Sequence, residues 1–174
     1  MRNSMTFDAF GKQYRMTQFP AVLAMDFINR SSDMSPVEIL QFTELKLGND
    51  WISLADRKVV NENVTDITGH MNPKYALSGL CNIVAGYSFG FLKTWKATKI
   101  PKRLSNESES VHSEYMDPII SNIIQEGIAT LRELEEYYSL EDAFKMFDVL
   151  VVKGLNKALA YEAAERDAKN SKKR

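Results

Sequence analysis

A nucleophilic cysteine–histidine pair is the first chemistry that this sequence could offer, with Cys81 beside His70 or His112. A reactive thiolate needs a base within hydrogen-bond reach, and histidine is the usual one. Cys81, however, lies in an apolar stretch with helical spacing, where a free cysteine is usually a small buried hydrophobic residue. We therefore expect Cys81 to be buried and unreactive.

Other residue types give no catalytic or metal site. Two histidines and one cysteine, widely spaced, do not form a ligand cluster. The carboxylates of Glu133, Glu135 and Glu136 cannot converge, because adjacent and alternate residues on a helix point in different directions. Gly86 and Gly90 lack the preceding strand and following lysine–serine pair of a phosphate-binding loop. We predict a protein that is not an enzyme and holds no cofactor and no metal.

Aromatic residues are the best candidates for a binding surface. The group comprises Tyr87, Phe89, Phe91 and Trp95. Such a group can close a core by filling space under neighbouring elements. It can equally anchor a partner, since aromatic side chains are favoured at interface hot spots. The sequence leaves both interpretations open.

A second candidate surface lies on the long apolar stripe of the last helix. Phe144, Phe147, Val151 and Leu155 recur on one side, and Leu150, Ala158 and Leu159 extend it. A stripe of this width exceeds the seam of a simple two-helix contact. We therefore expect this face to be covered by the rest of the chain, by a partner, or by both.

The C-terminal elements that position this stripe have clear start and stop signals. Asp117 and Pro118 open a helix, and Gly127 ends it. Thr130 can cap a second short helix, and Ser139 with Asp142 resembles the capping box of a third. The third helix should fray after about residue 168.

The N-terminal part combines strands and helices. Met5–Thr17 reads as a β-hairpin turning at Gly11. Further along, we predict helices over 20–29, over 35–48 from a capping box at Ser35, and over 75–89. Residues 51–64 suit a second hairpin, or a short helix and loop, with strands favoured.

Composition bounds the class of protein. The chain has 174 residues, 44% of them apolar and 26% charged, with a net charge of −1, as in ordinary soluble globular proteins. We predict a mainly α, α+β fold: a helical body with one or two small N-terminal β-hairpins. Its parts are an N-terminal hairpin and helical part (1–98), a mobile linker (99–116), a C-terminal helical part (117–168) and a frayed basic tail (169–174).

Charge and hydropathy argue against two classes of partner. A helix-turn-helix reading of the C-terminal part needs a basic surface. Between Thr130 and Tyr161, however, four residues are basic and six are acidic. A small DNA-binding regulator is therefore disfavoured, and we expect no nucleic-acid partner. No apolar run is expected to reach membrane-spanning length, so no membrane partner is predicted.

The C-terminal part contains four segments that together are typical of one family: Asp117–Pro118, Ala129-Thr130-Leu131 with Glu133-Leu134, Tyr138 to Ala143, and Asn156 with Leu159-Ala160. In these segments the chain resembles tail assembly chaperones and related small tail-module proteins of tailed bacteriophages. The segment SFGFLKTW is also similar to one in this family, with Ser88 in place of an asparagine. The N-terminal hairpin, followed by an apolar helix that begins at a proline, fits the same family.

The resemblance implies binding without catalysis. Chaperones of this family bind the long apolar helical tape measure protein and help the tail tube protein to polymerise around it, in the cytoplasm of the infected bacterium. Self-association is a further expectation. The alternative function is that of a structural tail or baseplate component retained in the virion.

Overall fold

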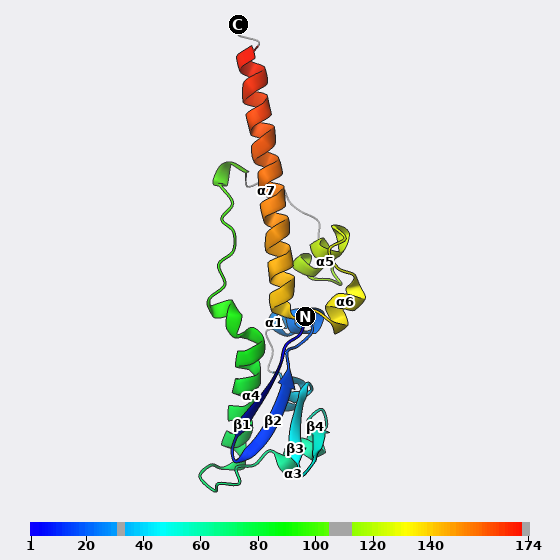
Figure 1. Cartoon of the computed structure of the whole chain (residues 1–174), viewed down its shortest axis with the longest axis vertical. Helices are drawn as coiled ribbons and strands as arrows, with labels where there is room; N and C mark the ends of the chain where they lie inside the picture. The colour runs from blue at the N-terminus through cyan, green and yellow to red at the C-terminus, as the bar shows by residue number, and fades with distance from the viewer. Residues whose placement is uncertain (31–33, 105–112, 172–174) are drawn as a thin grey trace.

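The computed structural model describes residues 1–30, 34–104 and 113–171. The fold is α+β, as predicted, with a sheet at one end and a long helix that projects from the other (Figure 1). The strands are β1 (Ser4–Ala9), β2 (Lys12–Thr17), β3 (Thr43–Leu47) and β4 (Asp50–Ser53). The helices are α1 (Ala21–Asn29), α2 (Pro36–Leu40), α3 (Arg57–Asn63), α4 (Pro73–Phe89), the short 3₁₀ turns η1 (Gly90–Lys93) and η2 (Lys102–Leu104), α5 (Pro118–Gln125), α6 (Leu131–Glu136) and α7 (Leu140–Ser171).

The four strands form one antiparallel sheet in the order β1-β2-β3-β4. The predicted first hairpin is confirmed: Phe10 (φ 55°) and Gly11 (φ 75°) make its two-residue turn. Positive φ at both positions matches the right-handed twist of the flanking strands. Tyr14 of β2 lies opposite Leu45 of β3, and both side chains are fully buried.

The predicted helix over 35–48 is only partly correct. The capping box at Ser35 is present, but α2 ends at Leu40 and the chain continues as strand β3. Thr43 and Leu45 are buried alternately against β2, so the period of two prevails over the helical pattern here. Gly48, with φ 62°, forms the turn to β4.

Residues 51–64 contain both predicted alternatives in succession. Strand β4 pairs with β3 through residues 50–53. Asp56 then caps helix α3, its carboxylate accepting hydrogen bonds from the backbone N–H groups of Lys58 and Val59. A second hairpin is therefore present, but β3 and β4 form it; the expected return strand at Val59 and Val60 is wrong, because these residues lie in helix α3.

Helix α4 supplies one wall of the core through Ala76, Leu80, Cys81, Val84 and Ser88. By length and composition alone, the stretch Pro73–Lys93 could cross a membrane. The expectation that no apolar run reaches that length is therefore wrong. In this structure Leu80, Cys81 and Val84 of α4 belong to the same core cluster as the sheet, and 28% of the apolar window is buried.

The predicted caps of the C-terminal helices are confirmed. The Asp117 side chain accepts a hydrogen bond from Ile119 N–H, and Gly127 adopts a φ of 69° after α5. Thr130 begins α6 in a full capping box. Helix α7 continues for 32 residues to Ser171, past the predicted point of fraying.

Sheet and C-terminal helices meet around helix α1 and share one core. The N–H of Ala21 donates to the carbonyl of Tyr138 at 2.9 Å, and the N–H of Arg2 donates to that of Tyr137 at 2.9 Å. The core cluster includes Phe19 and Ala24 from the N-terminal part and, from the C-terminal part, Ile120, Ile123, Leu134 and Leu140. The C-terminal half of α7 extends clear of this body (Figure 1).

Candidate partner-binding groove

The four aromatic residues at the end of α4 have two different sets of neighbours: Tyr87 and Phe89 pack against the core, and Phe91 and Trp95 contact helix α7. Phe89 stacks on Phe19, with ring centroids 5.7 Å apart and planes 25° apart. Phe19 is only 2% exposed and also contacts Phe27 and Phe42 edge to face. Phe89 is half-buried and packs against the core through this contact. Tyr87 also packs against the core, and burial raises the pKa of its hydroxyl.

Phe91 and Trp95 lie against helix α7 instead. Both rings meet the ring of Phe144 at steep angles, with centroids 5.6 Å and 5.5 Å away. The Phe91 and Trp95 rings are 6.1 Å apart. The 3₁₀ turn η1 lies between the end of α4 and Trp95 and contains Phe91. Edge-to-face contacts of this kind hold the three rings in fixed relative positions.

After Trp95, the chain runs beside α7 (Figure 1). The N–H of Thr98 donates to Oδ1 of Asp148 at 3.2 Å, and the guanidinium of Arg103 lies 3.3 Å from the Glu162 carboxylate. Of the predicted linker 99–116, residues 105–112 lie outside the described residues. Its first part follows α7 for several turns.

The groove between this segment, α5 and α7 has a volume of about 300 Å³. We call it the aromatic groove. Its lining is almost entirely apolar and consists of Trp95, Ala97, Thr98, Ile100, Ile119, Phe144, Phe147, Asp148 and Val151. Oδ1 of Asp148, the carboxylate in this lining, already accepts a hydrogen bond from the N–H of Thr98. The groove thus presents a hydrocarbon and aromatic surface that suits an apolar side chain.

A second hollow of about 390 Å³ lies on the other side of the α7 stripe, against α5. Phe147 and Val151 line both hollows, so the residues predicted from the stripe lie between them. The remaining lining is Asn122, Glu126, Leu150, Lys153, Gly154 and Lys157. Leu155 lines neither hollow and is half-buried one turn further along α7.

Sequence reasoning found four of the nine lining residues of the aromatic groove: Trp95, Phe144, Phe147 and Val151. It missed Ile100 because that residue was assigned to the linker 99–116, and Ala97 because it stands just before the linker among lysines. The isolated Ile100-Pro101 pair in that polar stretch was an available signal, since an exposed linker has no need of a large apolar side chain.

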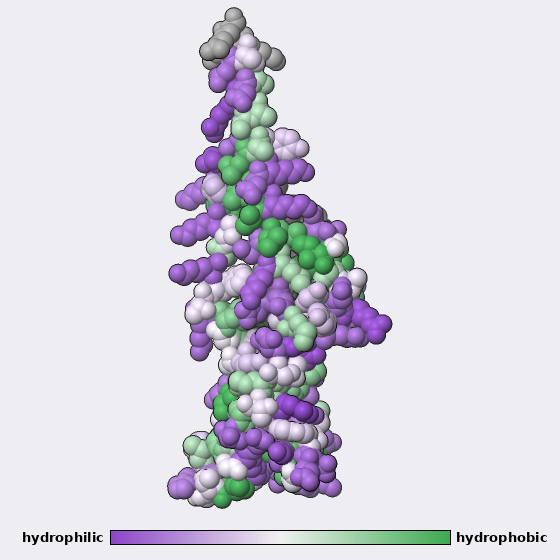
Figure 2. All heavy atoms as spheres, in the orientation of Figure 1, coloured by the Kyte–Doolittle hydropathy of each residue, from purple (hydrophilic) through white to green (hydrophobic). Residues whose placement is uncertain are grey.

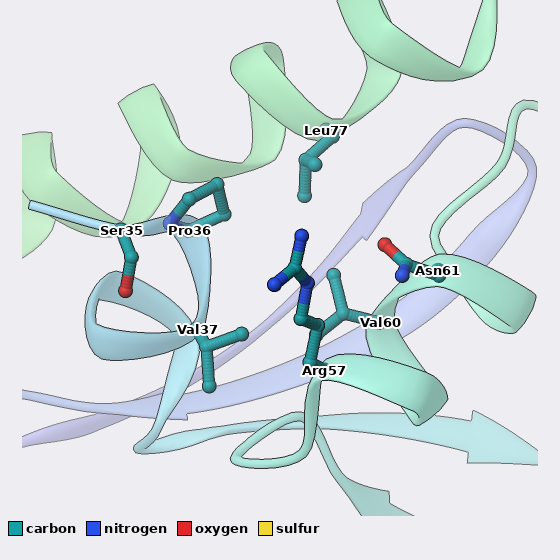
Figure 3. A pocket seen from close by; sticks show the side chains of 7 residues that line it. All are labelled: Ser35, Pro36, Val37, Arg57, Val60, Asn61 and Leu77. Carbon is teal, nitrogen blue, oxygen red and sulfur yellow. The ribbon is translucent and has the colours of Figure 1, made fainter.

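A larger pocket, of about 580 Å³, lies at the sheet end between α2, α3 and α4. Figure 3 shows the guanidinium of Arg57 reaching between Val37 and Leu77, with Val60 and Asn61 beside it. The Ser35 hydroxyl at its edge is occupied in the α2 capping box. The pocket can hold an apolar group next to one cation, but it contains none of the residues predicted to bind a partner.

The candidate nucleophile is placed as predicted. Cys81 is buried in α4, and its burial raises the pKa of the thiol, which disfavours the thiolate. His70 lies in the loop before α4, with Nδ1 2.9 Å from the Thr68 hydroxyl. His112 is outside the described residues. Among the described residues, no three His, Cys, Asp or Glu side chains are grouped as metal ligands would be.

Comparisons of the chain with protein-family models, with curated proteins and with solved structures find no match. The resemblance to tail assembly chaperones rests on the sequence segments quoted above.

Proposed function

We propose that the protein is a tail assembly chaperone of a tailed bacteriophage. It acts by binding an apolar helical segment of the tape measure protein, without catalysis, in the cytoplasm of the infected cell. The observation that carries the proposal is the aromatic groove, where residues of both predicted surfaces, Trp95 with Phe144, Phe147 and Val151, line one apolar hollow.

The physical need for such a groove is simple. A long apolar helix in water exposes contiguous hydrophobic surface and aggregates. An apolar groove can shield one face of such a helix, with side chains spaced three and four residues apart as anchors. Trp95 and Phe144 are of the type that dominates binding energy at interfaces, since large rings bury much area at little cost in conformational entropy.

The two tryptophans of the chain allow a controlled test. Trp95 lines the groove, whereas Trp51 lies on the sheet beneath the guanidinium of Arg15, 4.6 Å from its ring centre. In a Trp51→Phe variant the only indole is in the groove. Titration with tape measure protein fragments should then shift its fluorescence to shorter wavelength, because binding removes water from the ring.

Pull-down of co-expressed tape measure protein provides the second measurement. Trp95→Ala should reduce its recovery strongly, and Trp51→Ala should leave it unchanged. Equal recovery with both variants would contradict the proposed site. The same experiment with tail tube protein tests the second expected partner.

Mass spectrometry of purified particles separates this function from the structural alternative. A chaperone should be absent from finished virions. A tail or baseplate component should be present at a fixed copy number. Detection in virions, together with failure to bind tape measure protein, would overturn the proposal.

A further inference from the structure

A row of lysines follows the segment that forms one side of the aromatic groove. From Lys93 to Arg103 the chain has five basic residues and no acidic one, although the whole chain is nearly neutral. Figure 2 shows hydrophilic side chains projecting from the flank where this segment runs beside α7. Five of the 22 lysines and arginines of the chain therefore lie in the segment that forms one side of the groove.

The burial of this segment repeats every third residue. Trp95, Thr98, Pro101 and Leu104 are half-buried. The residue after each of the first three is an exposed lysine: Lys96, Lys99 and Lys102. We call these three residues the lysine row. They border the groove without lining it, whereas Ala97 and Ile100, next to Lys96 and Lys99 in the chain, line it.

The lysine row is available to a partner. Among the described residues, no carboxylate forms an ion pair with Lys96, Lys99 or Lys102, whereas Arg103 is paired with Glu162. Lysine side chains are long and flexible, so the ammonium groups can extend over the mouth of an apolar groove while their hydrocarbon stems stay against it. Lys96 lies between the lining residues Trp95 and Ala97, and Lys99 lies between Thr98 and Ile100, so an occupant of the groove would lie within reach of this positive charge.

We propose that the aromatic groove selects an amphipathic helix whose apolar face is bordered by acidic side chains; this inference rests on the proposed function of the groove as a helix-binding site. Apolar side chains of the partner fill the groove against Trp95 and Phe144. Its carboxylates meet the lysine row. The charges add specificity and speed of association more than affinity, because complementary potentials steer encounters and like charges reject other partners.

Two designed helical peptides test the charge preference. They share one leucine-rich face and differ only in the flanking positions, which are glutamate in one and lysine in the other. Both are titrated into the full chain carrying Trp51→Phe, with Trp95 fluorescence as the readout. Three exposed ion pairs correspond to a preference of roughly tenfold for the glutamate peptide. The preference should shrink as salt is raised, because exposed charges are screened.

Charge reversal of the lysine row gives the matched variant. Lys96→Glu, Lys99→Glu and Lys102→Glu together should abolish the preference or invert it. The control changes Lys58, Lys74 and Lys169 to glutamate, three exposed lysines away from the groove, with the same change in net charge. The control should keep the wild-type preference. Thermal melting checks that both variants fold. We expect them to fold, because all six substituted lysines are exposed.

The outcomes are distinguishable. If both peptides bind equally well, or if the two triple variants behave alike, the charge preference is overturned and the helix-binding function stands. If neither peptide binds, the proposed function of the groove fails with it. Tighter binding of a DNA duplex than of either peptide would assign the lysine row to nucleic acid and overturn the inference. A dimer that forms without peptide, and is lost on reversal of the row, would overturn it as well by assigning the row to a second copy.

Discussion

Phe89 and Phe91 are separated by one residue, yet they lie in different environments. Phe89 stacks on the core ring of Phe19, whereas Phe91 contacts Trp95 and Phe144, which line a surface groove. The residue types are the same. What differs is the ring that each contacts: Phe89 meets Phe19, which lies between β2 and α1, and Phe91 meets Phe144 of α7.

An apolar pattern in the sequence therefore predicts which side chains are buried, but it does not predict which element buries them. The same difference runs along α7. Leu140 and Ala143 at its start are almost fully buried against α1 and α5, while Leu159 and Tyr161 further along are exposed. The same kind of apolar sequence pattern can thus form part of the core or part of a surface groove.

The largest expected effect is on the core side. Phe19→Ala should lower the free energy of unfolding by about 3–5 kcal/mol, because it removes a ring that is almost fully buried among three others. Denaturant unfolding measures it. Trp95→Ala is the groove-side counterpart and should cost about 1–2 kcal/mol, since its ring is only half-buried. Equal losses of unfolding free energy in Phe19→Ala and Trp95→Ala would contradict the distinction between core and groove.

Phe144 lies on the boundary and should show both kinds of effect. Its ring supports Phe91 and Trp95 while lining the groove. Phe144→Ala should weaken binding of tape measure protein by about 2 kcal/mol or more. Its loss of folding stability should be smaller than that of Phe19→Ala, because the side chain is half-buried. Thermal melting and pull-down on the same variant separate the two; normal binding with a large folding loss would place Phe144 in the core.

Two glycines of α4 compare a face of this helix that is covered by another side chain with a face that is open. A Cβ on Gly79 would come within 2.8 Å of the Phe10 ring, whereas one on Gly86 meets no atom within 4 Å. Gly79→Ala should therefore destabilise the fold by about 1 kcal/mol or more, as overpacking does. Gly86→Ala should stabilise it by about 0.5–1 kcal/mol, through the helix propensity of alanine. The same sign of change in both melting temperatures would contradict this assignment of faces.

The smallest expected effect is a pH dependence at the start of α7, which carries both the core and the groove residues. Burial alone would raise the pKa of Asp142. Hydrogen bonds from the Met1 amine and from the N–H and hydroxyl of Ser139 outweigh it and hold that pKa below its ordinary value. Because the folded pKa lies below the unfolded one, this stabilisation is complete above a pH of about 4 and is lost as pH falls through the folded pKa.

Melting temperatures measured from pH 6 down to pH 3 check this. The wild-type protein should melt above Asp142→Asn at pH 6, and the gap should close towards pH 3. The lowered pKa values of Glu38 and Glu133 are common to both proteins and cancel in the difference. A gap that stays constant across this range would exclude Asp142 ionisation as its cause.

Features that depend on neighbouring residues in the chain could be predicted from the sequence. The caps at Ser35, Asp117 and Thr130 and the glycine turns after α5 and within the first hairpin all appear as expected. Their determinants lie within a few residues of one another, because a capping side chain satisfies backbone groups of its own first turn. The burial of Cys81 followed from the apolar helix around it in the same way.

Tertiary structure alone decided the features that depend on distant partners. Residues 43–47 form a strand because Leu45 pairs with Tyr14, thirty-one positions earlier in the chain. This strand pairing outweighs the helical spacing of the hydrophobic residues. The aromatic groove likewise needed the turn at η1, Ile119 from α5 and the tether between Thr98 and Asp148, fifty residues apart. Apolar residues require burial wherever they occur, but the surface that buries them is chosen only when the whole chain packs.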